Sequence, residues 1–209
     1  MNDTVNSNEP DMNCGVHYFQ EHLTAIIHHF YITGDVGLAV NYIEMIHTIR
    51  SAAPNDIIKI HLNTVGGCMD TGIQIINAIR ESHAHVVCEL EAQAFSVGSL
   101  IFLSGDEFVV HDNAVLMIHN FSGMVFGKGH EQRSRLDAVT DWFHDFARPL
   151  YVPFISEEEF DFVLDGKDMW MHSSEIGVRI EHMVDEKMAA IEAATKKPRK
   201  RKPSSQNKK

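Results

Sequence analysis

The chain has 209 residues, 44% of them hydrophobic, which is enough for one domain with a sizeable core. Its net charge of −11 is unevenly distributed, because 8 of the 18 Lys and Arg residues lie in 196–209, leaving 10 basic against 29 acidic residues in 1–195. An acidic body argues against nucleic acid as the ligand of the main domain. No apolar run reaches the roughly 18 residues of a membrane helix, so we expect no membrane association.

Targeting and redox signals are weak. The polar, acidic N-terminus has neither the basic start nor the apolar middle of a signal peptide. Three widely spaced cysteines, Cys14, Cys68 and Cys88, indicate free thiols in a reducing compartment. We therefore expect a cytoplasmic protein without a disulfide framework.

Strand and helix signals alternate along the first half of the chain. Short apolar runs bounded by turn residues indicate strands, and apolar positions at steps of three and four indicate helices. The pattern predicts strands over 30–33, 57–62, 86–90, 107–110 and 114–118, with helices over 36–51, 68–80 and 96–103 between the first four. This alternation predicts an α/β fold with a mostly parallel sheet.

The second half has a different character. Residues 123–129 are glycine-spaced and predict a hairpin or an extended excursion, followed by a long helix over 131–151 that Pro153 ends. A capping-box pattern at Ser156 predicts another helix. A short strand over 169–171 and a short helix over 173–177, ended by glycine, complete the pattern. The basic tail from Lys196 onward is of low complexity and is expected to be disordered.

Ser96 lies between a predicted strand and a predicted apolar helix, in the run Glu-Ala-Gln-Ala-Phe-Ser-Val-Gly-Ser-Leu over 91–100. A serine there sits at a helix N-terminus, where free N–H groups and the helix dipole favour a developing negative charge. That position suits a nucleophilic hydroxyl. By itself it also suits an ordinary helix cap.

Three further places offer partners for such a serine. Gly66 and Gly67 end the run Asn-Thr-Val-Gly-Gly between a strand and a helix, where glycines allow a tight turn and backbone N–H groups that point into a cleft. His119 ends a strand, and Asp168 follows a glycine turn. Each also has an interpretation without a catalytic role. The glycines could form a turn without a ligand, His119 is one of 14 histidines, and Asp168 could be an ordinary turn residue.

Metal binding would be another use of so many histidines. The sequence has no His-Glu-x-x-His and no Cys-x-x-Cys, and the adjacent His28 and His29 would point to different faces. We therefore predict no metal site and no cofactor.

Taken together, these segments resemble the ClpP-type Clp protease proteolytic subunit, a serine peptidase of the α/β ClpP/crotonase-like fold. Residues 63–67 resemble its Asn-Ser-Pro-Gly-Gly, residues 93–98 its Gln-Ala-Ala-Ser-Met-Gly, and residues 117–120 its Met-Ile-His-Gln. Residues 30–34 match its first strand, and residues 166–177 are similar to the segment that carries its aspartate. Order and approximate spacing are kept from about residue 27 to 185.

The resemblance implies a role for each site residue. Ser96 would be the nucleophile, His119 its general base and acid, and Asp168 the group that orients His119. The N–H groups of Gly67 and Val97 would form the oxyanion hole.

The resemblance also implies the domain organisation: an N-terminal extension over 1–26, a protease domain over 27–185 with a projecting handle over about 121–152, and a helix end with the basic tail over 186–209. In the family, handles of two stacked heptameric rings interlock around a closed chamber. An AAA+ ATPase unfoldase is the partner that the family implies, and proteins or peptides are the substrates.

The chain departs from the family at several positions. Thr64 and Val65 replace its serine and proline, and Phe95 places a ring beside Ser96 that we expect to influence which substrates fit. The N-terminal 26 residues do not resemble the family's axial segment, and the basic tail is unusual for it.

Two other functions remain open from the sequence. One is a viral protease for capsid or scaffold proteins on the same fold, with the basic tail binding nucleic acid or an acidic partner. The other is a non-proteolytic subunit, either crotonase-like, with paired N–H groups holding a thioester enolate, or a scaffold within a ring.

Overall fold

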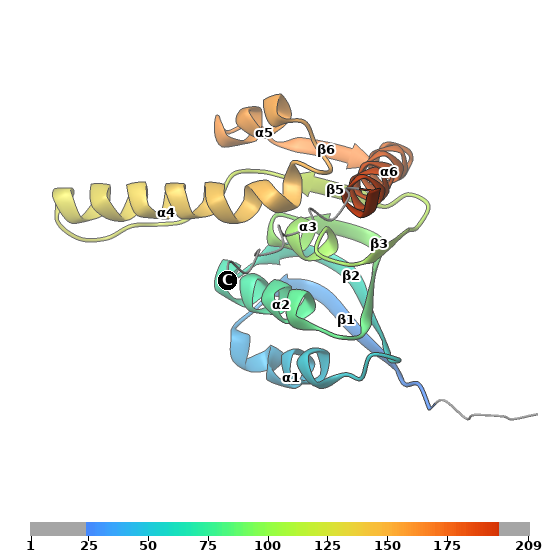
Figure 1. Cartoon of the computed structure of the whole chain (residues 1–209). Helices are drawn as coiled ribbons and strands as arrows, with labels where there is room; N and C mark the ends of the chain where they lie inside the picture. The colour runs from blue at the N-terminus through green and yellow to red at the C-terminus, as the bar shows by residue number, and fades with distance from the viewer. Residues whose placement is uncertain (1–23, 197–209) are drawn as a thin grey trace, which may run out of the picture.

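The computed structural model describes residues 24–196, which form a six-stranded sheet with helices packed on it (Figure 1). The strand order is β1-β2-β3-β5-β6, with β4 also paired to β3. The strands are β1 (Ile27–Val36), β2 (Ile57–Gly67), β3 (His85–Phe95), β4 (Glu107–Val110), β5 (Val115–Ile118) and β6 (Met169–His172). All pairings are parallel except that of β5 with β6, so the expected mostly parallel α/β sheet is confirmed.

Two short strands share one edge of β3. Its other edge is occupied by β2, so β4 lies beside Val87–Leu90 and β5 lies further along, beside Gln93–Phe95. This arrangement brings β5 to the carboxyl end of β3. The segment around Ser96 therefore has the end of β5 as its direct neighbour.

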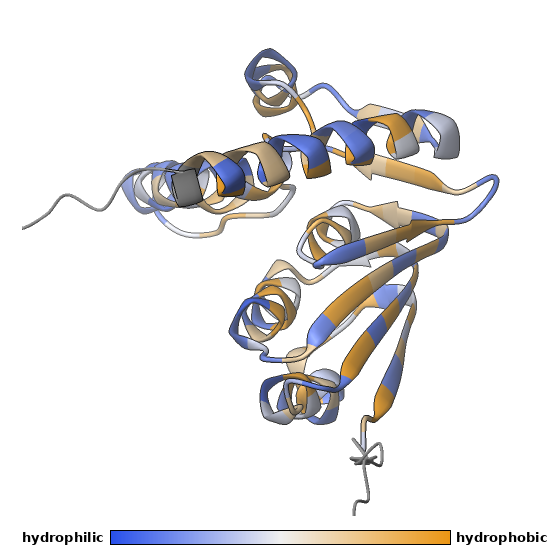
Figure 2. Cartoon of the chain, turned by 45° about the vertical axis from the view of Figure 1, so that its right-hand side comes forward, coloured by the Kyte–Doolittle hydropathy of each residue, from blue (hydrophilic) through white to orange (hydrophobic). Residues whose placement is uncertain are grey.

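The helices fill the connections between strands. They are the 3₁₀ helix η1 (Ala39–Tyr42), α1 (Ile43–Ser51), α2 (Met69–Glu81), α3 (Val97–Phe102), α4 (Gly129–Tyr151), α5 (Glu157–Leu164) and α6 (Ser173–Lys196). Helices α1, α2 and α3 lie side by side against one face of the sheet (Figure 1). The strands alternate between apolar and polar residues, visible as orange and blue segments in Figure 2. On β2, Ile58, Ile60 and Leu62 are fully buried.

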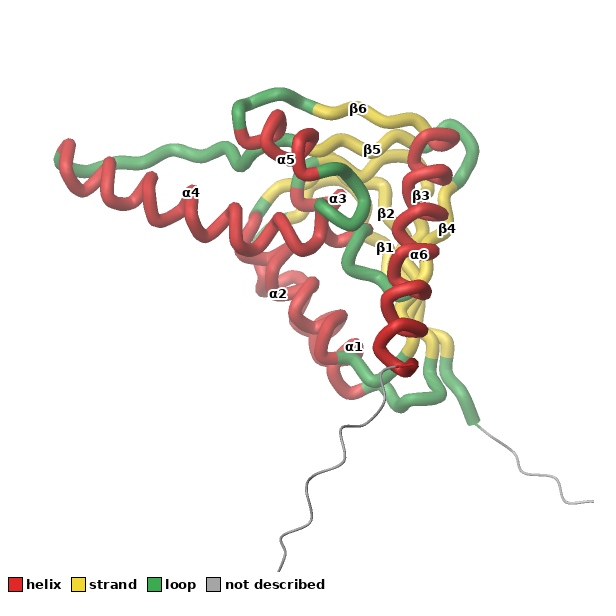
Figure 3. Tube along the Cα trace, turned by 45° about the horizontal axis from the view of Figure 1, so that its top comes forward, coloured by secondary structure: helices red, strands yellow, loops and turns green. Residues whose placement is uncertain are grey.

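Helix α4 and the segment before it project from this body, and we call them the handle (Figure 1). Residues 121–128 form no regular secondary structure and run alongside α4 (Figure 3), so they make the extended excursion and not the hairpin. The buried residues of α4 all lie in its last third: Phe143, Ala147, Leu150 and Tyr151. Of the described residues 24–196, the 121–128 segment is what lies beside the first part of α4 (Figure 3).

Several predicted boundaries were wrong. The helix expected over 36–51 begins as the 3₁₀ helix η1, and the strands ending at Gly67 and Phe95 run five residues further than expected. The short helix expected to stop at Gly177 continues to Lys196, because Ile176, Ile180 and Met183 extend its apolar stripe against the core. Glycine costs a helix only about 1 kcal/mol and ends it mainly in the left-handed conformation, which Gly177 does not adopt.

The capping box at Ser156 is confirmed. The Glu159 N–H donates to Ser156 Oγ at 3.1 Å, and the Ser156 N–H donates to Glu159 Oε2 at 2.9 Å.

Residues 1–23 and 197–209, which carry most of the expected N-terminal extension and the basic tail, lie outside the described residues. Between residues 24 and 196, no helix is both long and apolar enough to cross a membrane.

Candidate active site

Ser96 occupies a strained turn between β3 and α3. Its backbone has φ 55° and ψ −127°, a region that residues with a side chain rarely enter and that costs about 1–3 kcal/mol. A serine on a sharp strand-to-helix turn of this kind exposes its Oγ above the end of the sheet. Ser96 is half-buried, and its hydroxyl makes no hydrogen bond to any residue in the 24–196 range. The hydroxyl is therefore free to react.

Hydrogen bonds from the surrounding backbone hold this turn in place. The Ser96 N–H donates to the Met117 carbonyl of β5 at 3.0 Å. Its carbonyl accepts from the Ser99 N–H at 3.0 Å and from Ser99 Oγ at 2.6 Å. Ser99 Oγ also bonds the Tyr151 hydroxyl at 2.8 Å, and burial raises the pKa of that tyrosine. Sequence reasoning missed Ser99 and Tyr151, because nothing in the sequence indicates that residues 52 positions apart meet.

Gly66 lies directly against the turn. A Cβ at this position would lie 2.6 Å from the Phe95 carbonyl oxygen and 2.7 Å from Ser96 Cβ. Its φ of 88° also favours glycine. Only a residue without a side chain lets the end of β2 approach Ser96 this closely.

Thr64 and Gly67 hold the rest of the glycine turn. Thr64 Oγ1 donates to the Gly34 carbonyl at 2.5 Å and accepts from the Gly66 N–H at 3.0 Å. The threonine that departs from the family pattern therefore supports the turn.

A Cβ on Gly67 would collide with the Val36 carbonyl of β1. Val97 is the first residue of α3, so its N–H has no acceptor within the helix.

His119 and Asp168 lie opposite each other at the edge where β3 ends. The antiparallel register pairs Ile118 of β5 with Met169 of β6. His119 directly follows Ile118, and Asp168 directly precedes Met169, so the two backbones are neighbours. The parallel register pairs Phe95 with Met117, which brings Ser96 to the same edge. Residues 49 positions apart in sequence are thus brought together by strand pairing.

The three side chains are not hydrogen-bonded to one another. His119 is half-buried, Asp168 is exposed, and the part of the chain that is described shows no hydrogen bond or ion pair for either. Loose hydrogen bonds are common in catalytic groups without substrate. The fold brings the backbones of the predicted triad together without closing its hydrogen bonds.

Asn120 supports this arrangement and was missed in the sequence. Its side-chain amide donates to the Leu164 carbonyl at 2.9 Å, which ties the segment after His119 to the end of α5, just before Asp168. The signal in the sequence was slight: one polar residue directly after a candidate histidine.

A cavity of about 390 Å³ opens beside Ser96. Its lining comes from the glycine turn, the Ser96 turn, the excursion and the handle helix: Gly67, Cys68, Met69, Ser96, Phe121, Ser122, Gly123, Met124, Val125, Arg135, Leu136, Val139 and Trp142. The lining is predominantly apolar, as is usual for sites that bind side chains of a substrate. Neither His119 nor Asp168 lines it.

Phe95 lies elsewhere than expected. Its ring packs edge-on against Trp170 of β6, with ring centroids 5.1 Å apart, and it does not line the cavity beside Ser96. Side chains alternate between the faces of a strand, so the residue next to Ser96 in sequence points away from the cavity. Phe95 therefore does not shape this cavity, and its influence on which substrates fit stays a prediction.

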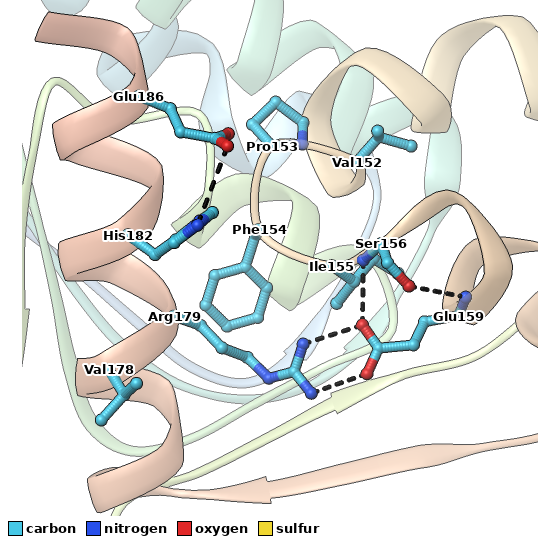
Figure 4. A pocket seen from close by; sticks show the side chains of 10 residues that line it. All are labelled: Val152, Pro153, Phe154, Ile155, Ser156, Glu159, Val178, Arg179, His182 and Glu186. Atoms are coloured by element: carbon cyan, nitrogen blue, oxygen red, sulfur yellow. Dashed lines mark hydrogen bonds and ion pairs between the residues drawn. The ribbon is translucent and has the colours of Figure 1, made fainter. Parts of the chain in front are cut away.

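A second cavity, of about 440 Å³, lies between α5, α6 and the 152–156 linker (Figure 4). Arg179 crosses it and binds both carboxylate oxygens of Glu159, at 2.7 and 2.9 Å. Mainly because of this pair, the pKa of Glu159 falls to about 2. The charges are satisfied by each other, so this pair fastens α5 to α6, and none of the predicted site residues lies here.

Other histidines form a polar cluster on the sheet face opposite α1 and α2. Buried His61 contacts His29 at 2.9 Å and Glu91 at 3.1 Å, and Lys59 binds Glu89 at 2.9 Å. The hydrogen bond from Lys59 lowers the pKa of Glu89. Among residues 24–196, no group of three or more His, Cys, Asp or Glu side chains is arranged to hold a metal ion.

Comparison with known proteins gives one match. No curated protein matches the chain. The family model described as Clp protease matches residues 24–147, a span that contains Gly67, Ser96 and His119 but ends before Asp168. The α/β sheet with its projecting helix agrees with that fold. The chain therefore belongs to the Clp protease family.

Proposed function

We propose that the chain is a serine endopeptidase, the proteolytic subunit of a ring-shaped chambered protease that hydrolyses peptides and unfolded proteins. The observation that carries this proposal is the Ser96 turn, where a free, half-buried hydroxyl on a strained backbone opens into a largely apolar cavity. Backbone strain of this kind is typical of functional sites, since an ordinary helix cap adopts an unstrained backbone.

In the proposed mechanism, Ser96 Oγ attacks the peptide carbonyl and His119 accepts its proton, then returns it to the leaving amine as the peptide bond breaks. A water molecule that His119 deprotonates then hydrolyses the acyl ester on Ser96 and restores the serine hydroxyl. Asp168, which the strand register sets opposite His119, orients the imidazole. The Gly67 and Val97 N–H groups receive the developing oxyanion. The side chains must move into hydrogen-bond contact, and substrate binding or assembly would supply that adjustment.

The handle supports assembly into stacked heptameric rings. The excursion and the outer part of α4 expose large apolar side chains, with Phe126 79% and Met124 83% exposed. Apolar groups gathered on a projecting arm indicate a partner surface, and the handle of a second copy has matching chemistry. An AAA+ ATPase in the cytoplasm would then make the chamber energy-dependent. Any contact with nucleic acid would be made by the basic tail.

The test is active-site labelling of the full chain with a fluorophosphonate probe. We expect one labelled residue, Ser96, and no labelling of Ser96→Ala. That variant should lose hydrolysis of an unstructured protein by about 10⁴-fold or more. Ser134→Ala, which changes an exposed serine of α4 outside the cavity, serves as the control.

Labelling at another serine, or peptidase activity retained by Ser96→Ala, would contradict the proposal. A correctly folded ring that is neither labelled nor active would favour a scaffolding subunit. Cleavage restricted to particle proteins without any ATPase would favour the capsid or scaffold protease.

A further inference from the structure

The cavity beside Ser96 has one charged residue in an otherwise neutral, largely apolar lining. Arg135 lies on α4 in the same wall as Leu136, Val139 and Trp142. Trp142 directly precedes Phe143, which is buried in the body, whereas Arg135 lies toward the projecting end of the handle. The cavity therefore reaches from the candidate nucleophile to a cation on the handle.

Arg135 also differs from the paired arginines of the body. Arg50, Arg148 and Arg179 each bind a glutamate within hydrogen-bond distance. Across residues 24–196, no carboxylate lies within 4 Å of the Arg135 guanidinium. The neighbouring Glu131 is occupied with the Lys128 N–H. In a strongly acidic body, this cation is left free at the wall of a cavity.

The spacing suits an extended peptide. Arg135 and Trp142 are seven residues apart on a helix, which is about 10 Å at 1.5 Å per residue. An extended chain covers that distance in about three residues. A side chain held in the apolar part of the cavity would thus leave a residue about three positions away beside Arg135.

We propose that Arg135 is a specificity-determining residue that binds an acidic side chain of the peptide substrate, about three residues from the one held in the apolar part of the cavity. This inference rests on the proposed peptidase function and names the substrate class that the site prefers. A guanidinium can bind a carboxylate through two parallel hydrogen bonds, which gives selectivity for Asp or Glu over their amides.

The experiment compares fluorogenic peptides that share one large apolar residue and carry a single Asp moved along both sides of it. Matched peptides carry Asn at the same position. With the wild-type full chain, we expect Asp to be preferred over Asn at one position by about tenfold in kcat/KM, and less so at high salt. Arg135→Gln should bring that ratio close to one, mainly by lowering kcat/KM for the Asp peptide.

Arg133→Gln is the matched control, since Arg133 is an exposed arginine on the same helix that does not line this cavity. It should keep the Asp preference. Arg135→Glu should reverse the preference toward a Lys peptide, which a structural role would not produce.

An unchanged Asp preference in Arg135→Gln, or an equal loss in Arg133→Gln, would overturn the proposal. A loss of all hydrolysis together with a smaller particle by light scattering would also overturn it, because Arg135 would then act in assembly. If the wild type hydrolyses no peptide at all, the peptidase proposal fails separately. In that case, fluorescence anisotropy of labelled Asp and Asn peptides on Ser96→Ala, with and without Arg135→Gln, still decides whether Arg135 selects a carboxylate.

Discussion

The turn at Ser96 is enclosed by its own chain, whereas the outer part of α4 is almost wholly exposed. Around Ser96, β2, β5 and α3 make close backbone contacts. Gly66 lies so close to the Ser96 turn that an added methyl group would collide with it. On the handle, Phe126 is 79% exposed and only the last third of α4 is buried. Both regions line one cavity.

One chain therefore forms only part of the candidate site by itself. The strained turn and the glycine turn are positioned by strands of a single sheet. Among residues 24–196, the handle wall of the cavity is largely exposed on its other side. Folding of one chain positions Ser96, and the proposed assembly through the handle would complete the outer substrate contacts.

Gly66→Ala disturbs the enclosed turn at Ser96 directly and should have the largest effect on activity among these variants. The added Cβ collides with backbone at Phe95, so the turn must shift, and a displacement near 1 Å at a nucleophile costs about 10²-fold in rate. Steady-state kcat/KM and the rate of fluorophosphonate labelling measure it. Gly177→Ala, where an added Cβ meets nothing within 4 Å, should keep full activity.

Met124→Glu with Phe126→Glu tests the exposed region. Charges on the excursion should prevent handles from packing together, and we expect multi-angle light scattering to show a smaller particle with reduced peptidase activity. Val178→Glu, at a residue 66% exposed on α6, is the control and should not change the particle. An unchanged particle in the double variant would show that the handle is not an interface.

Glu159→Gln removes the ion pair that fastens α5 to α6, so it tests the stability of the body separately from the handle. The pKa of Glu159 is about 2 when folded, below its ordinary 4.5, so its stabilisation is complete above about pH 5 and is lost as the pH falls toward 2. Gln keeps the capping-box acceptor but removes the charge. We expect about 2 kcal/mol lower unfolding free energy at pH 7 and a weaker dependence on pH between 5 and 2, by urea denaturation. Equal curves for both proteins would contradict the assigned role.

Tyr151→Phe should have the smallest effect. It removes one buried hydrogen bond to Ser99, the direct link between the Ser96 turn and the base of the handle. We expect a loss of about 1 kcal/mol by thermal unfolding, with kcat/KM nearly unchanged because Ser99 still bonds the Ser96 carbonyl. A large fall in activity would show that the two regions are coupled through this pair.

Much of the fold could be predicted because its signals are local. The apolar runs around Ile60 and Val86, the capping box at Ser156 and the glycines at 66 and 67 each act within a few residues. Predictions failed, or could not be made, where a distant contact decided the outcome. Helix α6 continues past Gly177 because the core covers Met183, and Phe95 turns toward Trp170 because β6 joins the far edge of the sheet.

The alternating α/β pattern, the family resemblance and the order of Ser96, His119 and Asp168 can be read from the sequence without the structure. These depend on residue types and on spacing along the chain. The folded chain was needed to show that Ser96 has a strained backbone, that the β5–β6 register sets His119 opposite Asp168, and that Arg135 lines the cavity beside Ser96. Strand pairing and the path of the handle join residues far apart in sequence, and no local preference encodes which of them will meet.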